Sequence, residues 1–298
     1  MDWRDDETTW RNSPEASKKV STYGNKWTEN VHPVTGRVHA NWKQIGASTG
    51  RMSCAKPNLQ NLPRDPGYRA CFRPAEGSVL VKADYEQIEL RIAAEMAPDA
   101  RMKRAFIEGK DLHATTATHL LGKEVEDVTA DERQLAKAVN FGLIYGMGAK
   151  ALADNARTSF GQDLDESEAT DIRRRYFEAY PGIRNWQQLQ GRKAETRTVL
   201  GRQRTLDGDR YYTARLNSPI QGTGADGLKL ALAKMWESRD DADAFPVLAI
   251  HDEIVVETPA EKAHEVKEWL TTCMVEGMAA FLRDVPVKVE IAVKDSWG

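Results

Sequence analysis

The sequence predicts an α+β protein, with a few scattered strands among a larger number of helices. Val79–Ala83 is a short apolar run rich in β-branched residues, which is typical of a buried strand. Val247–Ile250 and Ile254–Glu257 are two further runs only three residues apart, which is the spacing of a tight hairpin. Val285–Val293 alternates apolar with polar residues, as a strand buried on one face does.

The remaining elements are predicted from turn residues and helix caps. Clusters of glycine and proline indicate loops, Asp165 with Glu168 forms a capping pattern, and proline is favoured in the first turn of a helix. These signals predict a polar segment over 1–30, with a helical pattern near Ser17–Tyr23, and loops and short strands over 31–73. They predict a hairpin over Val199–Leu206. Helices are predicted over Glu86–Met96, within 99–160, from Asp165 to Tyr180, over Gly222–Ser238 and from Pro259 to Phe281.

The composition is that of an ordinary globular protein and excludes several classes. Hydrophobic residues make up 41% and charged residues 29% of the 298 positions. No apolar run is long enough to cross a membrane, and the acidic, polar start is not a secretory signal. The three cysteines are scattered, without a disulfide framework or metal-ligand spacing, which fits a reducing compartment. We therefore expect a cytoplasmic protein with no membrane partner.

Charge is distributed unevenly along the chain. The net charge is −3, yet residues 1–73 carry more basic than acidic side chains, so the rest of the chain is strongly acidic. A basic leading segment attracts phosphates locally. A chance fluctuation of surface charge explains the same distribution, and on charge alone we prefer that explanation.

Two aspartates stand beside apolar strands. Asp84 follows Val79–Ala83, where a fixed and partly desolvated carboxylate suits a hard cation, although alone it is better interpreted as the N-cap of the next helix. Asp252, in His251-Asp252-Glu253, would alone be a polar turn residue between strands. Placing the two acids together would cost several kcal/mol unless a cation such as Mg²⁺ compensated. These segments alone do not show that the two aspartates meet.

A stripe of cations and aromatic rings lies between these aspartates in the sequence. Arg133, Lys137, Phe141 and Tyr145 recur every fourth residue and so form one slanting stripe on a helix. The opposite side of that helix carries the apolar residues Leu135, Val139 and Leu143. The cations suit a triphosphate and the rings suit sugar and bases. A solvated basic face with two packed aromatics is an equally good interpretation of this helix alone.

Together, the three segments resemble motifs A, B and C of the family-A DNA polymerases, the bacterial DNA polymerase I family. The resemblance runs in order from about Thr35 to Trp297 and includes three further motifs, Thr49–Ser53 with Pro57–Pro63, Gly109–His113 and Asn217–Thr223. Six ordered motifs are far more specific than any one of them. The resemblance implies a right-hand polymerase palm, which is an antiparallel sheet with helices, plus helical fingers, with the thumb largely absent.

The resemblance gives the acids a catalytic role. Asp84 and Asp252 would ligate two Mg²⁺ ions, for which Mn²⁺ can substitute, assisted by the carbonyl of Tyr85. One ion would lower the pKa of the primer 3′-hydroxyl, and the other would steady the triphosphate and the departing pyrophosphate. Glu253 would orient this cluster as a further catalytic residue.

The resemblance also implies how the incoming dNTP is bound. Arg133, Lys137 and His113 would hold its phosphates, and Lys137 is also a candidate proton donor to pyrophosphate. Phe141 would stack beside the sugar and base. Glu89 would exclude a 2′-hydroxyl and so select deoxynucleotides.

Primer/template DNA is the second partner that the resemblance implies. Arg51 and Gln221 would contact the minor-groove edge, where hydrogen-bond acceptors are shared by all correct base pairs. Tyr145 would pack near the templating position. Asn217 and His251 are further candidate DNA contacts, although His251 is also explained as a hydrogen-bonded hairpin residue. Three further residues would support these groups. Gln87 would lie near the dNTP and Asn61 near the DNA, and Arg91 would be a supporting residue as well.

The sequence departs from the family pattern at two points. Glu86 replaces a residue that is usually a small serine, and we expect it to face solvent or pair with a basic neighbour. The stretch before Asn217 is shorter than usual, so an arginine expected to contact DNA falls near Thr213, and Arg215 is the candidate substitute.

The motifs divide the chain into an N-terminal segment and candidate thumb remnant (1–48), a first part of the palm (49–98), fingers (99–190) and a second part of the palm (191–298). Only 83 residues precede Asp84, so we expect neither a proofreading exonuclease nor a full thumb. Weak grip on DNA predicts low processivity and strong sensitivity to salt, because phosphate contacts dominate such binding.

The sequence therefore predicts a template-directed DNA polymerase that adds deoxynucleotides to a primer 3′ end by two-metal phosphoryl transfer and releases pyrophosphate, in a bacterial or phage-infected cell. Glu89 and Phe141 disfavour an RNA polymerase, which needs room at the 2′-hydroxyl. A non-catalytic DNA-binding module derived from a polymerase is one alternative. A second alternative is that the chain is one part of a split enzyme, which a thumb-bearing partner completes. Replication proteins are further candidate partners, and the sequence does not identify them.

Overall fold

The structure, a computed structural model, describes residues 25–63 and 66–298. In chain order, its elements are η1 (Asn25–Asn30), β1 (Asn41–Lys43), β2 (Ser53–Ala55), η2 (Leu59–Asn61), α3 (Pro66–Arg69), β3 (Ser78–Tyr85), α4 (Ile88–Met96), α5 (Ala100–Ile107), α6 (Leu112–Leu121), η3 (Val125–Asp127), α7 (Ala130–Ile144), α8 (Ala149–Phe160), α9 (Glu166–Ala179), α10 (Pro181–Gln190), β4 (Glu195–Arg197), β5 (Gln203–Thr205), η4 (Asp209–Tyr211), α11 (Tyr212–Glu237), η5 (Arg239–Asp241), β6 (Phe245–Ile250), β7 (Glu253–Pro259), η6 (Ala260–Lys262), α12 (Ala263–Ala279) and β8 (Val289–Lys294).

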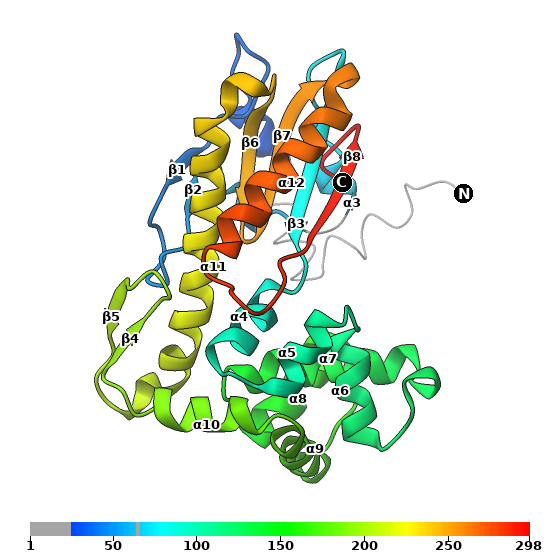
Figure 1. Ribbon diagram of the computed structural model, residues 1–298. Coiled ribbons are helices and arrows are strands. Elements are labelled where there is room, and N and C mark those ends of the chain that lie inside the picture. Colours follow the sequence, from blue (N-terminus) through cyan, green and yellow to red (C-terminus); the bar gives the residue numbers. More distant parts are fainter. Residues whose placement is uncertain (1–24, 64–65) are drawn as a thin grey trace.

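A four-stranded antiparallel sheet in the order β6-β7-β3-β8 lies at the centre of the upper part of the molecule (Figure 1). In its inner strand β3, Val81 and Ala83 are buried, whereas Lys82 and Asp84 keep part of their surface exposed. Successive side chains of a strand point to opposite faces. One face of β3 is therefore apolar, and the other carries Lys82 and Asp84.

Helices α11 and α12 cover the apolar face of the sheet (Figure 1). Ile254 and Val256 of β7 are fully buried in the same core as Met274 of α12. The two helices pack closely, because a Cβ added at Gly277 of α12 would lie 2.6 Å from the backbone nitrogen of Ala231 in α11. The two helices and the apolar face of the sheet therefore form one large core.

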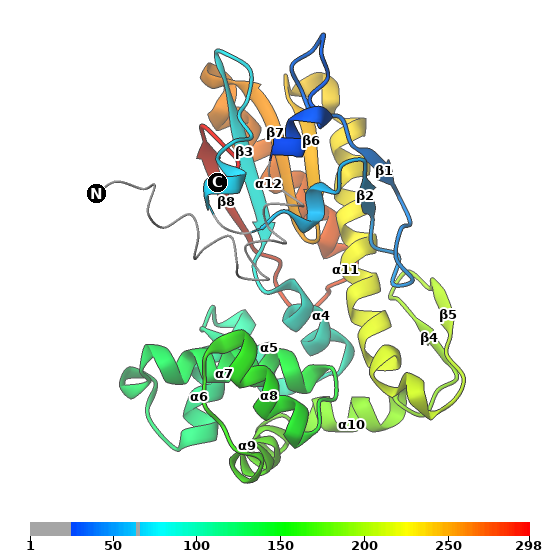
Figure 2. The same ribbon diagram turned by 180° about the vertical axis from the view of Figure 1, so that it is seen from behind.

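The N-terminal segment lies against the other face, as the opposite view shows (Figure 2). A second, smaller core forms there from Leu59, Leu62, Leu248, Val255 and Trp297. The segment therefore leaves only part of this face open, around the ends of β3 and β7.

Helices α5 to α9 form a separate helical layer beyond α4 (Figure 1). Capping boxes begin α7 at Thr129 and α9 at Asp165, and the second of these is the one expected from the sequence. Val139 and Leu143 of α7 are fully buried in the same continuous core as the sheet. Helix α7 contacts α4, and α4 follows directly from β3, so α7 is positioned relative to the sheet through α4.

Three elements differ from the predictions. The β4–β5 hairpin begins at Glu195, four residues before the expected start at Val199. Helix α11 begins at Tyr212, ten residues before the expected start at Gly222, and runs through Pro219. Proline has no N–H for the carbonyl four residues earlier. In its place, Gln190 Nε2 donates to the carbonyl of Arg215 at 3.4 Å, and this contact lets the helix continue.

The last strand, β8, begins at Val289 instead of Val285. The backbone N–H groups of Asp284 and Val285 donate to the Glu95 carboxylate, each at 3.1 Å, and the Pro286 carbonyl accepts from Arg91. Side chains of α4 therefore satisfy this stretch of backbone before it can join the sheet.

The predicted helical pattern near Ser17–Tyr23 lies outside the described residues. In the described part of the chain, no helix is long and apolar enough to cross a bilayer. The predicted boundaries at 48, 98 and 190 stay predictions.

Candidate active site

The sheet brings together the two aspartates that lie far apart in the sequence. Asp84, near the end of β3, pairs in register with Glu253, the first residue of β7. The backbone N–H of Tyr85 donates to the Asp252 carbonyl at 3.3 Å. The N-cap of α4 is Gln87, and Asp84 belongs to β3, so the alternative that Asp84 caps the helix is wrong.

Two left-handed residues shape the loops that hold these acids. His251, with φ +57°, forms the turn between β6 and β7 together with Asp252. Gln87, with φ +52°, forms the turn from β3 into α4. Non-glycine residues adopt this conformation only when the surrounding structure enforces it. Both turns lie at the same end of the sheet, so the two acids lie side by side there.

Electrostatics set Asp84 apart. Burial, followed by the negative charges of Asp252 and Glu253, raises the pKa of Asp84 from 3.8 to about 7, and Lys82 opposes this rise. Burial also raises the pKa of Asp252, to which Glu89 and Glu253 contribute. Without a compensating cation, ionising both acids is therefore unfavourable.

Divalent metal ions fit the groups that are present. The Oδ1 atom of Asp84 and the Oε1 atom of Gln87 are buried, and in the described structure neither has a hydrogen-bond partner. Mg²⁺ prefers oxygen ligands and binds through one or two carboxylates plus substrate phosphates. Among the described residues, no group of three or more His, Cys, Asp or Glu side chains has a ligating arrangement. The site thus offers a pair of carboxylates of the kind that Mg²⁺ binds together with a substrate.

Glu253 is held by two partners that sequence analysis missed. Lys82 Nζ lies 3.0 Å from its Oε2 atom, and Trp297 Nε1 donates to its Oε1 atom at 2.8 Å. Both carboxylate oxygens are therefore occupied, which agrees with the expected orienting role better than with metal ligation. Lys82 could have been recognised, because it lies two residues before Asp84 and so on the same face of the strand. Nothing in the sequence pattern points to Trp297.

The raised pKa of Asp84 predicts how stability depends on pH in metal-free protein. Since the folded pKa lies above the unfolded one, the contribution of this group to stability falls as pH rises from about 4 to about 7. We expect Asp84→Asn to raise the melting temperature in EDTA at pH 8 by roughly 2–4 °C, after allowance for partial exposure, and to change it little near pH 4.

Thermal unfolding of both proteins in EDTA between pH 4 and pH 8 measures this effect. Other groups contribute to the pH dependence of each protein, so the relevant quantity is the difference between them. A wild-type melting temperature that stays parallel to that of the variant over this range would show that Asp84 ionises normally.

Glu89 is the centre of a second cluster next to Asp252. Its carboxylate forms an ion pair with Arg51 and accepts a hydrogen bond from the hydroxyl of Tyr145. Gln221 of α11 also hydrogen-bonds Tyr145. Four residues that were predicted to contact the nucleotide or the DNA thus meet, although they come from four separate segments: Arg51, Glu89, Tyr145 and Gln221. Burial, followed by the charge of Glu89, raises the pKa of Tyr145 well above its usual value, so Tyr145 remains a donor.

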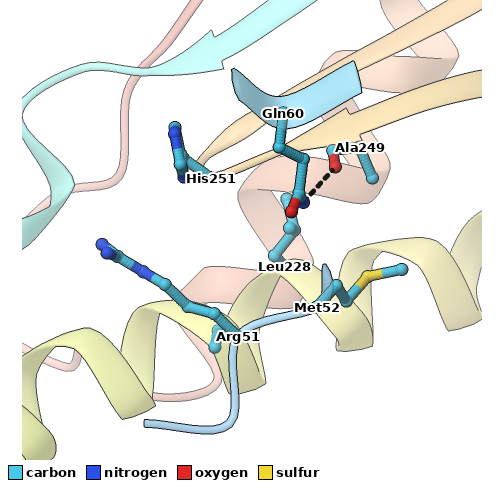
Figure 3. A pocket seen from close by; sticks show the side chains of 7 residues that line it. Arg51, Met52, Gln60, Leu228, Ala249 and His251 are labelled. Carbon is cyan, nitrogen blue, oxygen red and sulfur yellow. Dashed lines mark hydrogen bonds between the residues drawn. The ribbon is translucent and has the colours of Figure 1, made fainter. Parts of the chain in front are cut away.

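A pocket of only about 10 Å³ lies beside this cluster, between the N-terminal segment, α11 and β6 (Figure 3). The side chains of Arg51 and His251 line this pocket, and both extend to the side away from Met52 and Leu228 (Figure 3). Gln60 donates to the carbonyl of Ala249 at 3.1 Å and ties the segment that contains Asn61 to the strand before His251. Asn217 lies one helical turn before Gln221, and its Oδ1 atom is buried without a partner in the described structure.

The cationic stripe of α7 lies against the start of α6. Arg133 Nε lies 2.5 Å from Asp111 Oδ2, while Asp111 Oδ1 accepts the backbone N–H of His113 at 2.8 Å and so caps α6. The ring centroids of His113 and Phe141 are 5.9 Å apart. Sequence analysis missed Asp111, although an aspartate two residues before His113 is a recognisable cap.

His113, which was expected to hold phosphates with Arg133 and Lys137, is buried and uncharged. It is 2% exposed, and burial lowers its pKa to about 4, to which Arg133 and Lys137 contribute while Asp111 opposes the change. The imidazole is therefore neutral near pH 7. The positive charge of this site comes from Arg133 and Lys137 alone among these three residues.

The structure decides two of the departures from the family pattern. The carboxylate of Glu86 accepts from Arg91 at 2.9 Å, which confirms the expected pairing with a basic neighbour. The prediction that Arg215 contacts DNA is wrong. Its guanidinium is 6% exposed and donates to the carbonyls of Leu206, Gly191 and Gly208 at 2.7–2.9 Å, so it ties the β5 loop to α11 and is not available to DNA.

An antiparallel sheet that presents two carboxylates opposite a cationic helix is suited to phosphoryl transfer. The sequence model of DNA polymerase family A matches residues 9–298, and this chain belongs to that family. The solved POL domain of Pol1 from M. smegmatis, in complex with DNA primer-template and dNTP, superposes with a TM-score of 0.86 and 31% identity over 95% of this chain and 52% of that chain. The predicted mixed fold of helices and antiparallel sheet is thereby confirmed.

Curated relatives agree with this assignment. DNA polymerase I of Aquifex aeolicus is 45% identical over an alignment of 273 residues, which covers 89% of this chain and 47% of that protein. The thermostable DNA polymerase I of Thermus aquaticus is 36% identical over an alignment of 300 residues, which covers 95% of this chain and 35% of that protein. The chain spans half or less of the length of these relatives.

Proposed function

We propose that this chain carries the active site of a DNA-directed DNA polymerase, which adds deoxynucleotides from dNTPs to a primer 3′ end and releases pyrophosphate. The observation that carries the proposal is the convergence of Asp84 and Asp252 at one sheet end, next to the Glu89 cluster. The M. smegmatis relative supports it, since that POL domain is in complex with DNA primer-template and dNTP.

Two divalent cations, Mg²⁺ or Mn²⁺, would be held by Asp84, Asp252 and the backbone carbonyl of Tyr85. When bound, they supply Lewis-acid activation of the 3′-hydroxyl and neutralise the phosphates. The side chain of Tyr85 points into the core and donates to Met274, so only its backbone is available to the site. The Lys82–Glu253–Trp297 contacts hold an additional negative charge in place beside Asp84.

Arg133 and Lys137 would bind the triphosphate. Arg133 is already oriented by Asp111, which reduces the entropy lost when phosphate binds. Lys137 can also donate a proton to the departing pyrophosphate. Phe141 would stack beside the sugar and base, next to the buried ring of His113.

Glu89 would select deoxynucleotides. Its carboxylate is fixed by Arg51 on one side and Tyr145 on the other, so it cannot easily rotate away from an added 2′-hydroxyl. Gln87, at the left-handed turn just before α4, would support the substrate from the same loop.

Primer/template DNA would contact Arg51 and Gln221, with further contacts from Asn217, His251 and Asn61. These residues surround the pocket in Figure 3 or lie on the adjoining turns of η2 and α11. We assign residues 49–98 and 191–298 to the palm, because they contain the central sheet, and residues 99–190 to the fingers, because they contain α5 to α10.

A non-catalytic DNA-binding module is the competing proposal. A protein that only binds DNA has no use for two half-buried acids that repel phosphate, nor for a carboxylate whose pKa is raised to about 7. One part of a split enzyme would keep the same active site, and it would need a second chain for tight binding to DNA.

Primer extension with the purified chain and Mg²⁺ tests the proposal. We expect extension of a primer on a DNA template with dNTPs, little extension with rNTPs, and none without divalent metal ions. Stable DNA binding without any extension, at low salt and high enzyme concentration, would favour the binding module. Extension that appears only after a second chain is added would favour the split enzyme.

A further inference from the structure

We propose that Asn140 fixes His113 as the Nε2–H tautomer, so that a neutral imidazole donates a hydrogen bond to the triphosphate of the incoming nucleotide. Asn140 becomes a positioning residue, which acts through His113. The identity of the ligand rests on the proposed function, whereas the tautomer does not.

The first step is the contact between the two side chains. Asn140 Nδ2 lies 3.0 Å from His113 Nδ1. An amide nitrogen can only donate, so the imidazole nitrogen that faces it has to accept, and the ring proton is then on Nε2. Nδ1 has Asn140 as its hydrogen-bond partner, whereas in the described part of the chain no protein group accepts a hydrogen bond from Nε2. That N–H is consequently available to a ligand.

The second step is what orients the Asn140 amide. Asn140 Nδ2 also donates to Thr116 Oγ1 at 3.0 Å, so both protons of the amide have acceptors. The same Thr116 oxygen lies 3.1 Å from Asn140 Oδ1 and 2.8 Å from the hydroxyl of Tyr180, which holds Thr116 in place. Turning the amide over would leave one of its two buried N–H groups without an acceptor among these partners. The amide therefore presents Nδ2 to His113.

The third step is burial, which makes this chain of hydrogen bonds rigid. Thr116, Asn140 and Tyr180 are all 0% exposed. Water cannot replace a partner at such a site, and a buried polar group left without one is costly. The buried contacts of Tyr180 and Thr116 therefore keep the Asn140 amide in the orientation that donates to His113.

The fourth step is the setting of His113. Arg133 and Lys137 lie on the same helix as Asn140, seven and three residues before it, and both cations lower the pKa of His113. A protonated imidazole would add a third positive charge to this group, which burial opposes. A neutral N–H donor binds a phosphate oxygen without that additional charge. The helix that holds the cations thus also sets the tautomer of the third donor.

The tautomer can be measured directly by ¹⁵N NMR of protein labelled at histidine. For His113, assigned by its loss in His113→Gln, we expect an unprotonated Nδ1 and a protonated Nε2 near pH 7. Adding dATP and Mg²⁺ without DNA should shift the Nε2 resonance. In Asn140→Asp, the new carboxylate can only accept a hydrogen bond from the ring, so Nδ1 should become protonated and donate to it. Asn155→Asp, on α8, makes the same chemical change away from this chain of hydrogen bonds and should leave the His113 signals unchanged.

Kinetics provide the second test. Asn140→Leu keeps the side-chain size but removes the donor, and we expect KM for dNTP to rise about tenfold with kcat changed less than about threefold. Thr116→Val removes only the group that orients the amide and should raise KM by a smaller factor. If Asn140→Leu does not fold, Thr116→Val provides the kinetic test in its place.

The outcomes separate this inference from the proposed function. A wild-type His113 protonated at Nδ1, or an Nε2 resonance that dATP does not move, would overturn the inference even if the enzyme extends primers. An Nε2–H tautomer whose resonance moves with dATP would uphold it even if no primer were extended.

Discussion

Replacing Asp252 with asparagine is expected to slow primer extension at least about 1000-fold, because electrostatic stabilisation by bound metal ions usually provides a large share of phosphoryl-transfer catalysis. Asp84→Asn should have a similar effect. Both substitutions keep the size of the side chain and remove one negative charge from a site where the two acids lie side by side. Single-turnover extension on a primer/template, at saturating dNTP and Mg²⁺, measures the loss.

The control is Asp163→Asn, since the Asp163 side chain is 97% exposed in the segment before α9. It should extend primers at the wild-type rate, whereas the loss of extension in Asp84→Asn and Asp252→Asn, purified in the same way, rules out a contaminating polymerase. If Asp84→Asn and Asp252→Asn both kept more than a tenth of the wild-type rate, the paired aspartates would not be the catalytic centre. Thermal unfolding of Asp84→Asn and Asp252→Asn beside the wild-type protein shows whether a loss of activity results from unfolding.

Replacing Glu89 with alanine is expected to reduce the preference for dNTP over rNTP by about 100-fold, measured as the ratio of kcat/KM values for the two substrates. The side chain is clamped between Arg51 and Tyr145, so the wild-type carboxylate cannot move aside for a 2′-hydroxyl. Alanine removes both the obstruction and the charge. Extension with dNTP itself should fall, because Arg51 and Tyr145 lose their shared partner.

Glu89→Gln separates the two causes. Glutamine keeps the obstruction and can still accept from Tyr145, but it weakens the contact with Arg51, so most of the selectivity should remain. Glu178→Ala, on the exposed surface of α9, is the matched control and should change neither substrate. If Glu89→Ala still rejected ribonucleotides at the wild-type ratio, another residue would have to provide selectivity.

The sequence by itself determined most of the local structure. The capping pattern at Asp165 and the β6–β7 hairpin around Asp252 lie where their signals predicted, whereas the β4–β5 hairpin begins at Glu195, before the expected Val199–Leu206. These features depend on residues within a few positions of one another, so a linear pattern contains them. The ordered motifs also determined the family, since their residue types and sequence order are properties of the chain alone.

Only the tertiary structure decided which of these residues act together. Asp84 looked like a helix cap until β3 and β7 paired, and Arg215 looked like a DNA contact until its three donors were found on backbone carbonyls. The extension of α11 through Pro219 depended on Gln190, a residue from another helix. Such outcomes depend on which groups become buried beside one another, and a linear pattern does not contain that information.

The same reason explains the features that sequence analysis missed around the two aspartates. The Glu253 carboxylate is held by Trp297 from the end of the chain and by Lys82 from β3, and the field of Glu253 in turn helps raise the pKa of Asp84. The sequence predicted that two aspartates at strand ends would hold metal ions if they met. The packing of β3, β7 and β8 decided that they meet, because hydrogen bonding between strands fixes register across any distance along the chain.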